Sequence, residues 1–344
     1  MNKKCVSFFI KSAGFLTLFC VTISLFSQEP PDSALNGKVS YVSTAMYMSK
    51  YQTINKEKLE SFSKEQLIYR RDLYYDTAQL LTKDASFNRR NSEETTIINK
   101  YDANGKLSEQ LELAYRLTVT KKTTFLYHPN GNLKQSVDYD ASNAVKGSVY
   151  YTYNAQNQIL TKKTYNSIHL LLESLEYQYD SNGNVIMIKN IPTINKENIP
   201  YQIENQYDTK NRLICERKYD KNNVLETEYL CVYNSKTGLL QYEITKNIAG
   251  DTVFYTQYTY DRKNRIASKF QLNPLKPTIR RTNTFYTYNK QNQCVTISVY
   301  LLYNTKKPDI VKKYFYDDHG NWQAWIEQSN EELKIVSQRK ITYL

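Results

Sequence analysis

The chain of 344 residues carries few groups that could do metal or acid–base chemistry. Its three histidines, His128, His169 and His319, show no metal-ligand spacing. The Asp-Ser-Asn-Gly-Asn run that begins at Asp180 is spaced like the start of a calcium loop, but its twelfth position is Ile191, which cannot ligate through its side chain. The sequence also lacks a Gly-x-Ser-x-Gly elbow, a phosphate loop and a dinucleotide fingerprint. We therefore predict no metal, no cofactor, no catalytic residue and no enzyme activity.

Thiol chemistry is limited by the number and place of the cysteines. Two of the five cysteines lie in the N-terminal segment, which leaves Cys215, Cys231 and Cys294. An odd number leaves at least one unpaired thiol. A turn at 219–223 would place Cys215 opposite Glu228 rather than opposite Cys231. Buried, inert thiols are therefore favoured, and the pattern leaves open whether two of them pair.

A short motif recurs nine times and organises most of the chain. Eight copies have Tyr followed by Asp or Asn and the copy at Tyr127 has His128 there; each continues with a polar run with Gly or Asn and an apolar residue, and successive copies start 26 to 28 residues apart. Asp and Asn accept hydrogen bonds from the backbone just downstream, and Gly and Asn tolerate positive φ, so each copy predicts a hairpin turn. Our candidate site residues are the turn residues of these copies: Tyr101, Asp102, Gly105, Tyr127, Gly131, Tyr153, Asn157, Tyr179, Asp180, Gly183, Tyr207, Asp208, Tyr233, Gly238, Tyr260, Asp261, Tyr288, Asn292, Tyr316, Asp317 and Gly320.

The residues before each turn alternate with a period of two, as in a half-buried strand. Val149, Tyr151 and Tyr153 share one apolar face, and polar side chains occupy most alternate positions. We expect packing to explain this tyrosine stripe, whose hydroxyls would reach water or a backbone partner. The alternative is an aromatic surface for sugars or peptides, for which Tyr150 and Tyr165, off the stripe, are the better candidates.

These patterns predict an all-β protein of tandem β-hairpins, forming one large, curled or spiral antiparallel sheet of about 18–20 strands. We divide the chain into a signal peptide (1–27), a linker with N-terminal cap strands (28–74) and a hairpin repeat domain (75–344). The cap region contains predicted strands at 41–48 and 67–75 and a short helix or loop at 55–64. A closing strand is expected at 333–344, and we expect the terminal segments to cover the open edge of the sheet.

The first 27 residues have the order of a secretory signal peptide: Lys3 and Lys4, an apolar stretch, then Ser27. We therefore expect export to the periplasm, the outer surface or the medium, with no membrane span after cleavage. The whole chain has a net charge of +12, and removing the signal leaves +9. The cations are interspersed with acids, which indicates solvated strand faces or weak attraction to anionic polymers, and not a nucleic-acid partner.

The run of Tyr-Asp, two residues, Gly-Asn and an apolar residue resembles the YD repeat of the Rhs family. The match is clearest at Tyr179–Val185 and Tyr316–Trp322, and the repeats cover about three quarters of the chain. The resemblance implies a strip of hairpins wound into a curved sheet, as in the short exported YD-repeat proteins of Bacteroidota-type bacteria. The copy at Tyr127–Leu133 also resembles MORN-like repeats, which are built from hairpins in a similar way.

Three functions remain from this reading. The first is a non-enzymatic exported repeat protein that binds an unidentified protein or glycan of the cell envelope or surroundings. The alternative is a structural shell or adaptor element for a separately encoded, toxin-like secreted protein. A cryptic hydrolase of envelope polymers ranks third and would require clustered carboxylates with raised pKa values.

Overall fold

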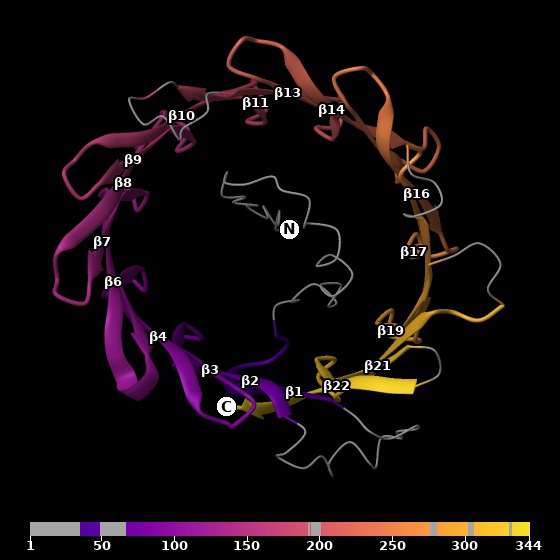
Figure 1. Ribbon diagram of the computed structural model, residues 1–344, viewed down its shortest axis with the longest axis horizontal. Coiled ribbons are helices and arrows are strands. Elements are labelled where there is room, and N and C mark those ends of the chain that lie inside the picture. The colour runs from indigo at the N-terminus through magenta and orange to yellow at the C-terminus, as the bar shows by residue number, and fades with distance from the viewer. Residues whose placement is uncertain are drawn as a thin grey trace. The chain divides into compact units, whose positions relative to one another are not determined.

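A computed structural model describes residues 35–48, 67–191, 193, 201–275, 281–301, 306–329 and 332–344 (Figure 1). The chain divides into two units, residues 1–36 and 37–344, and the second contains all the secondary structure described below. The predicted signal peptide and the predicted helix or loop at 55–64 lie outside the described residues.

The second unit is an all-β structure whose strands follow one another along the chain, as predicted. Within the described residues these strands number 22, and one single-turn 3-10 helix, η3 (Tyr115–Leu117), interrupts them. The 22 strands are β1 (Val39–Met48), β2 (Leu67–Tyr75), β3 (Leu81–Phe87), β4 (Glu93–Tyr101), β5 (Leu107–Ala114), β6 (Thr118–Tyr127), β7 (Leu133–Asp140), β8 (Val145–Tyr153), β9 (Ile159–Asn166), β10 (Leu171–Tyr179), β11 (Val185–Ile191), β12 (Tyr201–Tyr207), β13 (Leu213–Tyr219), β14 (Leu225–Tyr233), β15 (Leu240–Lys246), β16 (Thr252–Tyr260), β17 (Ile266–Leu272), β18 (Arg281–Tyr288), β19 (Cys294–Tyr300), β20 (Ile310–Tyr316), β21 (Trp322–Ser329) and β22 (Glu332–Tyr343).

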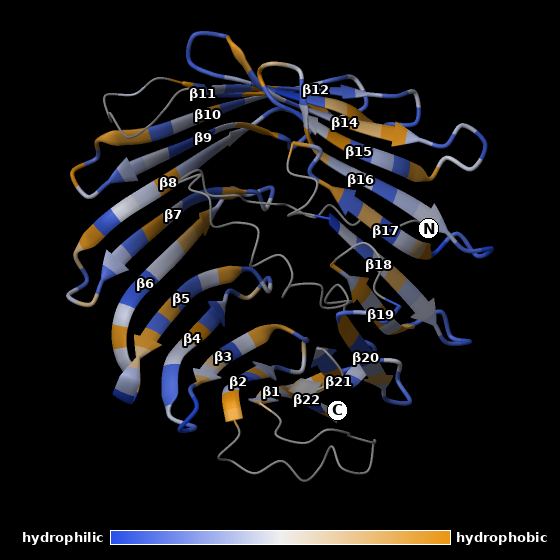
Figure 2. Cartoon of the chain, turned by 45° about the vertical axis from the view of Figure 1, so that its right-hand side comes forward, coloured by the Kyte–Doolittle hydropathy of each residue, from blue (hydrophilic) through white to orange (hydrophobic). Residues whose placement is uncertain are grey.

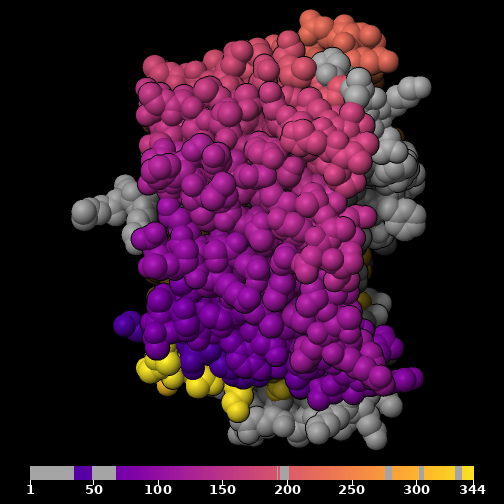
Figure 3. All heavy atoms as spheres, turned by 90° about the vertical axis from the view of Figure 1, so that its left-hand side faces the viewer, coloured from indigo at the N-terminus to yellow at the C-terminus, as the bar shows by residue number. Residues whose placement is uncertain are grey.

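The sheet closes into a barrel, so the predicted curled or spiral sheet is wrong in this respect. Every strand pairs antiparallel with the next, and β1 also pairs with β22, from Val39 opposite Tyr343 to Met48 opposite Ile335. Figure 1 shows the resulting ring of strands, and Figure 3 shows successive hairpins stacked in chain order along one side. Closure satisfies the N–H and C=O groups that two open edges would leave unpaired. The expectation that the terminal segments cover the edge is confirmed by this pairing.

Each repeat turn contains a β-bulge that keeps the tyrosines in phase. In β8 and β9 the register runs from Gly147 opposite Asn166 to Thr152 opposite Thr161, and then shifts so that Tyr153 is opposite Ile159. The face that carries Tyr151 and Tyr153 is called the tyrosine face below, and the other is called the opposite face. An extra residue in one strand is what a bulge inserts, and it increases the local twist.

Buried side chains occur on both faces of the sheet, contrary to the expected single buried face. Leu175 and Thr256 are buried on the tyrosine face, and Ser148 and Cys215 are buried on the opposite face. Figure 2 shows hydrophobic and hydrophilic residues mixed along most strands, with hydrophilic turns at their ends. A single closed layer of sheet has no second layer that would bury one whole face.

The densest packing lies where the sheet closes. On the tyrosine face Trp322 and Trp325 of β21 pack with Ile297 and Tyr314. On the opposite face Ala324, Ile326 and Val336 form a second cluster. Because side chains are buried on both faces here, these strands are well placed to hold the seam between β1 and β22 closed.

Candidate binding surface

All nine repeat turns lie along one edge of the barrel. Each joins an even-numbered strand to the next odd-numbered one, and since neighbouring strands are antiparallel these turns share an edge. We call this edge, from the β4–β5 turn to the β20–β21 turn, the repeat rim. The structure places every predicted site residue, from Tyr101 to Gly320, on this rim.

In eight of the nine turns the Asp or Asn side chain after the tyrosine accepts hydrogen bonds from the backbone, whereas the β6–β7 turn has His128 there and Asn130 Oδ1 accepts from the Asn132 N–H at 3.1 Å. The Oδ1 atom of Asp180 accepts hydrogen bonds from the backbone N–H groups of Asn182 and Asn184, both at 2.9 Å. The same pair of bonds forms at Asp102, Asn154, Asp208, Asp261 and Asp317. These bonds, with the side-chain amide of Asn184, lower the pKa of Asp180 below its usual value. The predicted capping role is confirmed.

The residue with positive φ follows in each turn, as predicted. Gly183 has φ of 85°, and its N–H donates to the carbonyl of Asp180 at 3.1 Å. Where the sequence lacks Gly, Asn takes the position, as at Asn157 with φ of 62° and Asn292 with φ of 65°. Gly and Asn reach this conformation at lower cost than other residues.

The first tyrosine of each motif ties its turn to the previous hairpin. The hydroxyl of Tyr179 donates to the carbonyl of Ile159, twenty residues earlier, at 2.8 Å. The equivalent bond forms from Tyr101, Tyr127, Tyr153, Tyr207, Tyr233, Tyr260, Tyr288 and Tyr316 at 2.7 to 3.0 Å. Burial raises the pKa of these phenols, to about 12 for Tyr316, so they stay protonated and can donate.

A second set of contacts joins neighbouring turns around the rim. In six of these turns the residue before the returning strand reaches the positive-φ residue of the next turn. Gln158 Nε2 donates to the carbonyl of Gly183 at 3.3 Å, and Arg212 Nη1 donates to the carbonyl of Gly238 at 2.6 Å. Gln293 Nε2 reaches Gly320 in the same way at 3.1 Å. The rim is therefore a connected row of turns rather than a set of independent loops.

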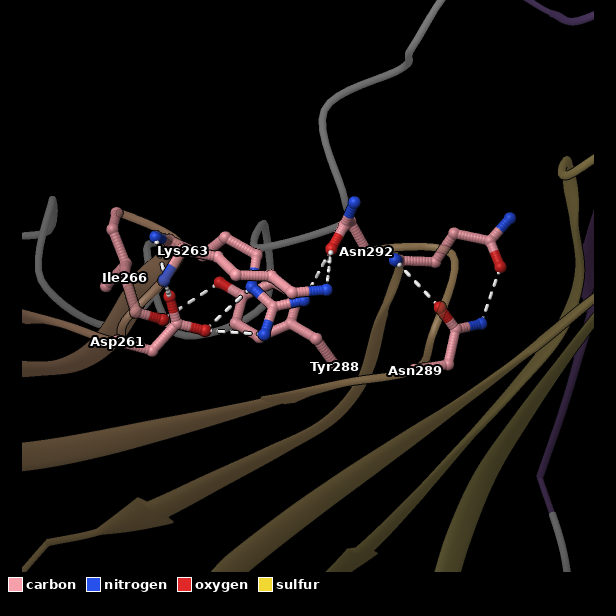
Figure 4. Close-up of polar contacts among 8 residues, drawn as sticks. Asp261, Lys263, Ile266, Tyr288, Asn289 and Asn292 are labelled. Carbon is pink, nitrogen blue, oxygen red and sulfur yellow. Dashed lines mark hydrogen bonds and ion pairs between the residues drawn. The ribbon is translucent and has the colours of Figure 1, made fainter.

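Figure 4 shows two such turns side by side. The hydroxyl of Tyr288 donates to the carbonyl of Ile266 at 2.9 Å, and Lys263 Nζ reaches Asn292 Oδ1 at 3.2 Å. Asp261 binds the guanidinium of Arg265, and this guanidinium also lies 4.3 Å from the centre of the Tyr288 ring. Sequence reasoning missed these contacts between turns, because they depend on variable residues inside the motif, such as Lys263 and Arg265, and on which turns become neighbours.

The opposite face carries an aromatic patch formed by Tyr150, Tyr165 and His169. The rings of Tyr165 and His169 are stacked with centroids 4.4 Å apart, and Tyr150 meets Tyr165 edge-on at 5.5 Å. Gln135 donates from Nε2 to the Tyr150 hydroxyl at 2.9 Å, and Lys163 is opposite Tyr150 in the register. The structure thus brings together the two tyrosines predicted as ligand candidates and adds His169 from the β9–β10 turn, which the sequence did not single out as a ligand candidate.

A compact polar cluster lies on the tyrosine face of β14 to β17. The carboxylate of Glu243 accepts hydrogen bonds from the hydroxyls of Tyr229 and of Tyr258, the latter at 2.6 Å. Burial, followed by these bonds, raises the pKa of both phenols. Lys269 is opposite Tyr258, and burial lowers its pKa. The carboxylate is used by two donors, so the arrangement stabilises the sheet and offers one acid rather than the carboxylate pair of a hydrolase.

The three cysteines are free thiols in the structure. Cys215 and Cys231 are buried, Cys294 is partly buried, and burial raises the pKa of Cys294 to about 11. Cys215 is opposite Leu230, two positions beyond the predicted Glu228: the pair that closes the turn, Tyr219 with Leu225, accounts for one position and the bulge next to it for the other. Its Sγ still lies 3.9 Å from Glu228 Oε1. Thiols in such surroundings have low reactivity.

Metal sites and membrane-spanning helices are the two other features considered among the described residues. No group of three or more His, Cys, Asp or Glu residues with metal-binding geometry occurs among them. Among the same residues, no helix has the length and apolar character required to cross a membrane.

No protein-family model and no curated protein matches the sequence. Among solved structures, TcdB2-TccC3-Cdc42 aligns with a TM-score of 0.38 and 18% identity over 78% of this chain and 15% of that chain. The Photorhabdus luminescens Tc holotoxin pore aligns with a TM-score of 0.38 and 15% identity, over 86% of this chain and 15% of that one. A porin-like protein from Bacteroides uniformis gives 0.29 and 11% identity, over 89% and 98%. The chain thus spans about 15% of the first two, and these likenesses assign no family.

Proposed function

We propose that the protein is an exported, non-enzymatic β-hairpin repeat protein that binds a glycan of the cell envelope or surroundings. The observation that carries this proposal is the aromatic patch of Tyr150, Tyr165 and His169 on the opposite face. Aromatic rings stack on the apolar faces of sugars. Beside the rings, Gln135 offers an amide group and Lys163 an ammonium group to sugar hydroxyls. The paired strands β8, β9 and β10 supply the scaffold on which this patch sits.

The binding test uses the full mature chain and a panel of neutral oligosaccharides, measured by isothermal titration calorimetry. Tyr165→Leu together with His169→Asn removes the stack while Asn keeps the positive φ of 60° at position 169. We expect at least tenfold weaker binding to any oligosaccharide that the unmodified chain binds. The matched control is Phe285→Leu, which breaks an equivalent edge-on pair with Tyr300 elsewhere on the opposite face. Equal loss in both variants, or no loss in the first, would contradict the patch.

Export is tested separately, by the mass of the protein recovered from cell fractions. A mature N-terminus near Gln28 in the envelope or medium supports export. A chain that begins at Met1 and stays in the cytoplasm contradicts it, whatever the outcome of the binding test.

A second candidate function, a structural shell or adaptor element, is favoured by the pairing of β1 with β22. Closure gives a continuous wall without free strand edges, which suits a scaffold for another chain. Ile341→Pro places a proline inside β22, where Ile341 is opposite Val42 at the seam, and the interior of a sheet tolerates proline poorly. A stoichiometric protein that copurifies with the unmodified chain, and is lost with Ile341→Pro but retained with Tyr165→Leu, would favour the shell over the glycan-binding function.

A further inference from the structure

Positive charge is concentrated on one part of the repeat rim. The four consecutive turns from β12–β13 to β18–β19 contain seven cationic residues and two carboxylates. The four preceding turns, from β4–β5 to β10–β11, contain one lysine and two carboxylates. In the linear sequence the charges look interspersed, because neighbouring turns of the rim are 26 to 28 residues apart along the chain. The cations of the basic turns are Lys210, Arg212, Lys236, Arg262, Lys263, Arg265 and Lys290.

Two of these seven cations are already used within the fold. Arg212 forms an ion pair with Asp208, and Arg265 forms one with Asp261, both at 2.5 Å. The other five are exposed, and no ion pair involves them among the residues that the structure describes. We call this set the basic arc: Lys210, Lys236, Arg262, Lys263 and Lys290. Unpaired charges of one sign on neighbouring turns repel each other, so an anionic ligand would relieve a cost already present in the free protein.

The scaffold fixes the spacing of the arc. Neighbouring repeat turns are two strands apart, which corresponds to about 10 Å along the rim. Arg212 donates to the carbonyl of Gly238 in the next turn at 2.6 Å, and Arg265 donates to Asn292 at 2.9 Å. These ties reduce the motion of the turns relative to one another. A linear ligand with regularly spaced anionic groups would therefore meet cations that are already in position.

The side chains between the cations indicate which polyanion fits. Thr209, Ser235 and Gln291 are exposed on the same turns and present hydroxyl and amide groups. The nearby rings of Tyr233 and Tyr288 are each covered by a guanidinium, at 4.1 and 4.3 Å from the ring centres. Nucleic-acid strands need open aromatic rings on which bases stack, whereas sugars use hydroxyl and amide partners.

We propose that the basic arc binds a linear anionic polysaccharide that runs along the rim from the β12–β13 turn to the β18–β19 turn. The acidic groups pair with the five cations, and the sugar hydroxyls meet the side chains between them. This site is separate from the aromatic patch on β8, β9 and the β9–β10 turn, so each can fail without the other.

The test replaces all five cations of the arc with glutamine in the full mature chain. The probes are polygalacturonate for carboxylates and heparin for sulfates, with neutral dextran as the blank, measured by biolayer interferometry at several salt concentrations. We expect the arc variant to lose about 30-fold or more in affinity for the polyanion and to show a shallower salt dependence. The two probes distinguish the acidic group that the arc prefers.

The matched control removes the same charge elsewhere: Lys134, Lys146, Lys189, Lys221 and Lys313, all exposed and outside the arc, are replaced with glutamine. We expect at most about threefold loss, because only the long-range field changes. Equal loss in both variants would overturn the arc as a site. Stronger binding to poly(dT) or to phosphatidylglycerol vesicles than to either polysaccharide would overturn the assignment of the ligand. Circular dichroism confirms that both variants remain folded.

Discussion

The hydrogen bond from each motif tyrosine to the previous hairpin predicts a measurable stability loss on removing one oxygen atom. Tyr179→Phe deletes the hydroxyl that lies 2.8 Å from the carbonyl of Ile159 and leaves the ring in place. A neutral hydrogen bond of this kind contributes about 1 kcal/mol net to the free energy of unfolding. Since the ring still packs, the change isolates the tie between two neighbouring hairpins.

The loss should add over distant copies of the motif. Tyr127, Tyr179 and Tyr260 are in turns at least four strands apart, which is about 19 Å along the rim. Changes at that separation usually add. We therefore expect the triple Phe variant to lose about 3 kcal/mol in the free energy of unfolding. Urea denaturation of the mature chain, followed by circular dichroism and extrapolated to water, measures this quantity.

The control is Tyr115→Phe, at a tyrosine that is 63% exposed. No hydroxyl bond of Tyr115 occurs among the described residues, so we expect a change of less than about 0.5 kcal/mol. If Tyr179→Phe loses no more than Tyr115→Phe, the hydroxyl tie does not stabilise the fold. If the triple loss greatly exceeds the sum of the single losses, the hairpins unfold as one unit, and the reasoning from independent repeats fails.

Three further predictions test other features of the fold. The bonds from Arg212 lower the pKa of Asp208 to about 2, below an unfolded value of about 4. The stability that this carboxylate contributes is therefore present above pH 4 and is lost as the pH falls toward 2. Asp208→Asn should make the urea midpoint depend less on pH over that range. Gly147→Ala would place a Cβ 2.8 Å from the carbonyl oxygen of Tyr165, so we expect a loss of about 2 kcal/mol in urea denaturation, larger than that of Ser148→Ala. Burial raises the pKa of Cys294 to about 11, so iodoacetamide at pH 8 should label it slowly in the native chain and rapidly in urea, as followed by peptide mass spectrometry; rapid native labelling would contradict the burial.

The local structure was predictable because each turn encodes its own geometry. The strand predicted at 67–75 coincides with β2, and the strand predicted at 333–344 differs from β22 by one residue at each end. Asp180 and Gly183 specify their turn through two backbone bonds and one positive φ, and neither feature depends on distant residues. The register of Cys215 was wrong by two positions because the turn closes at Tyr219 and Leu225, one position later than predicted, and because a bulge of one residue leaves no mark that strict alternation can detect.

The site features depend on which turns become neighbours, and the motif alone does not state this. Gln158 and Arg212 occupy the same position in their repeats, and both reach the next turn, although one is neutral and the other charged. The aromatic patch needs Tyr150, Tyr165 and His169 to meet across a hairpin, which follows from the register once the bulge is known. Placing side chains by strand and turn number, rather than by position in the chain, is what shows the basic arc.

The repeat pattern could not predict that the sheet closes, and the reason is physical. A repeat fixes the contact between one hairpin and the next, so it describes a growing strip equally well whether the strip stays open or closes. The deciding pair is β1 with β22, and neither strand carries the motif. At the rim, β22 is joined to the last repeat turn, where Tyr343 donates to Asp317 at 2.5 Å and accepts from Asn321 at 2.7 Å. Tyr343 thus continues the row of turn contacts past the last repeat, and since Tyr343→Phe removes two hydrogen bonds it should lower the free energy of unfolding in urea denaturation more than Tyr179→Phe does.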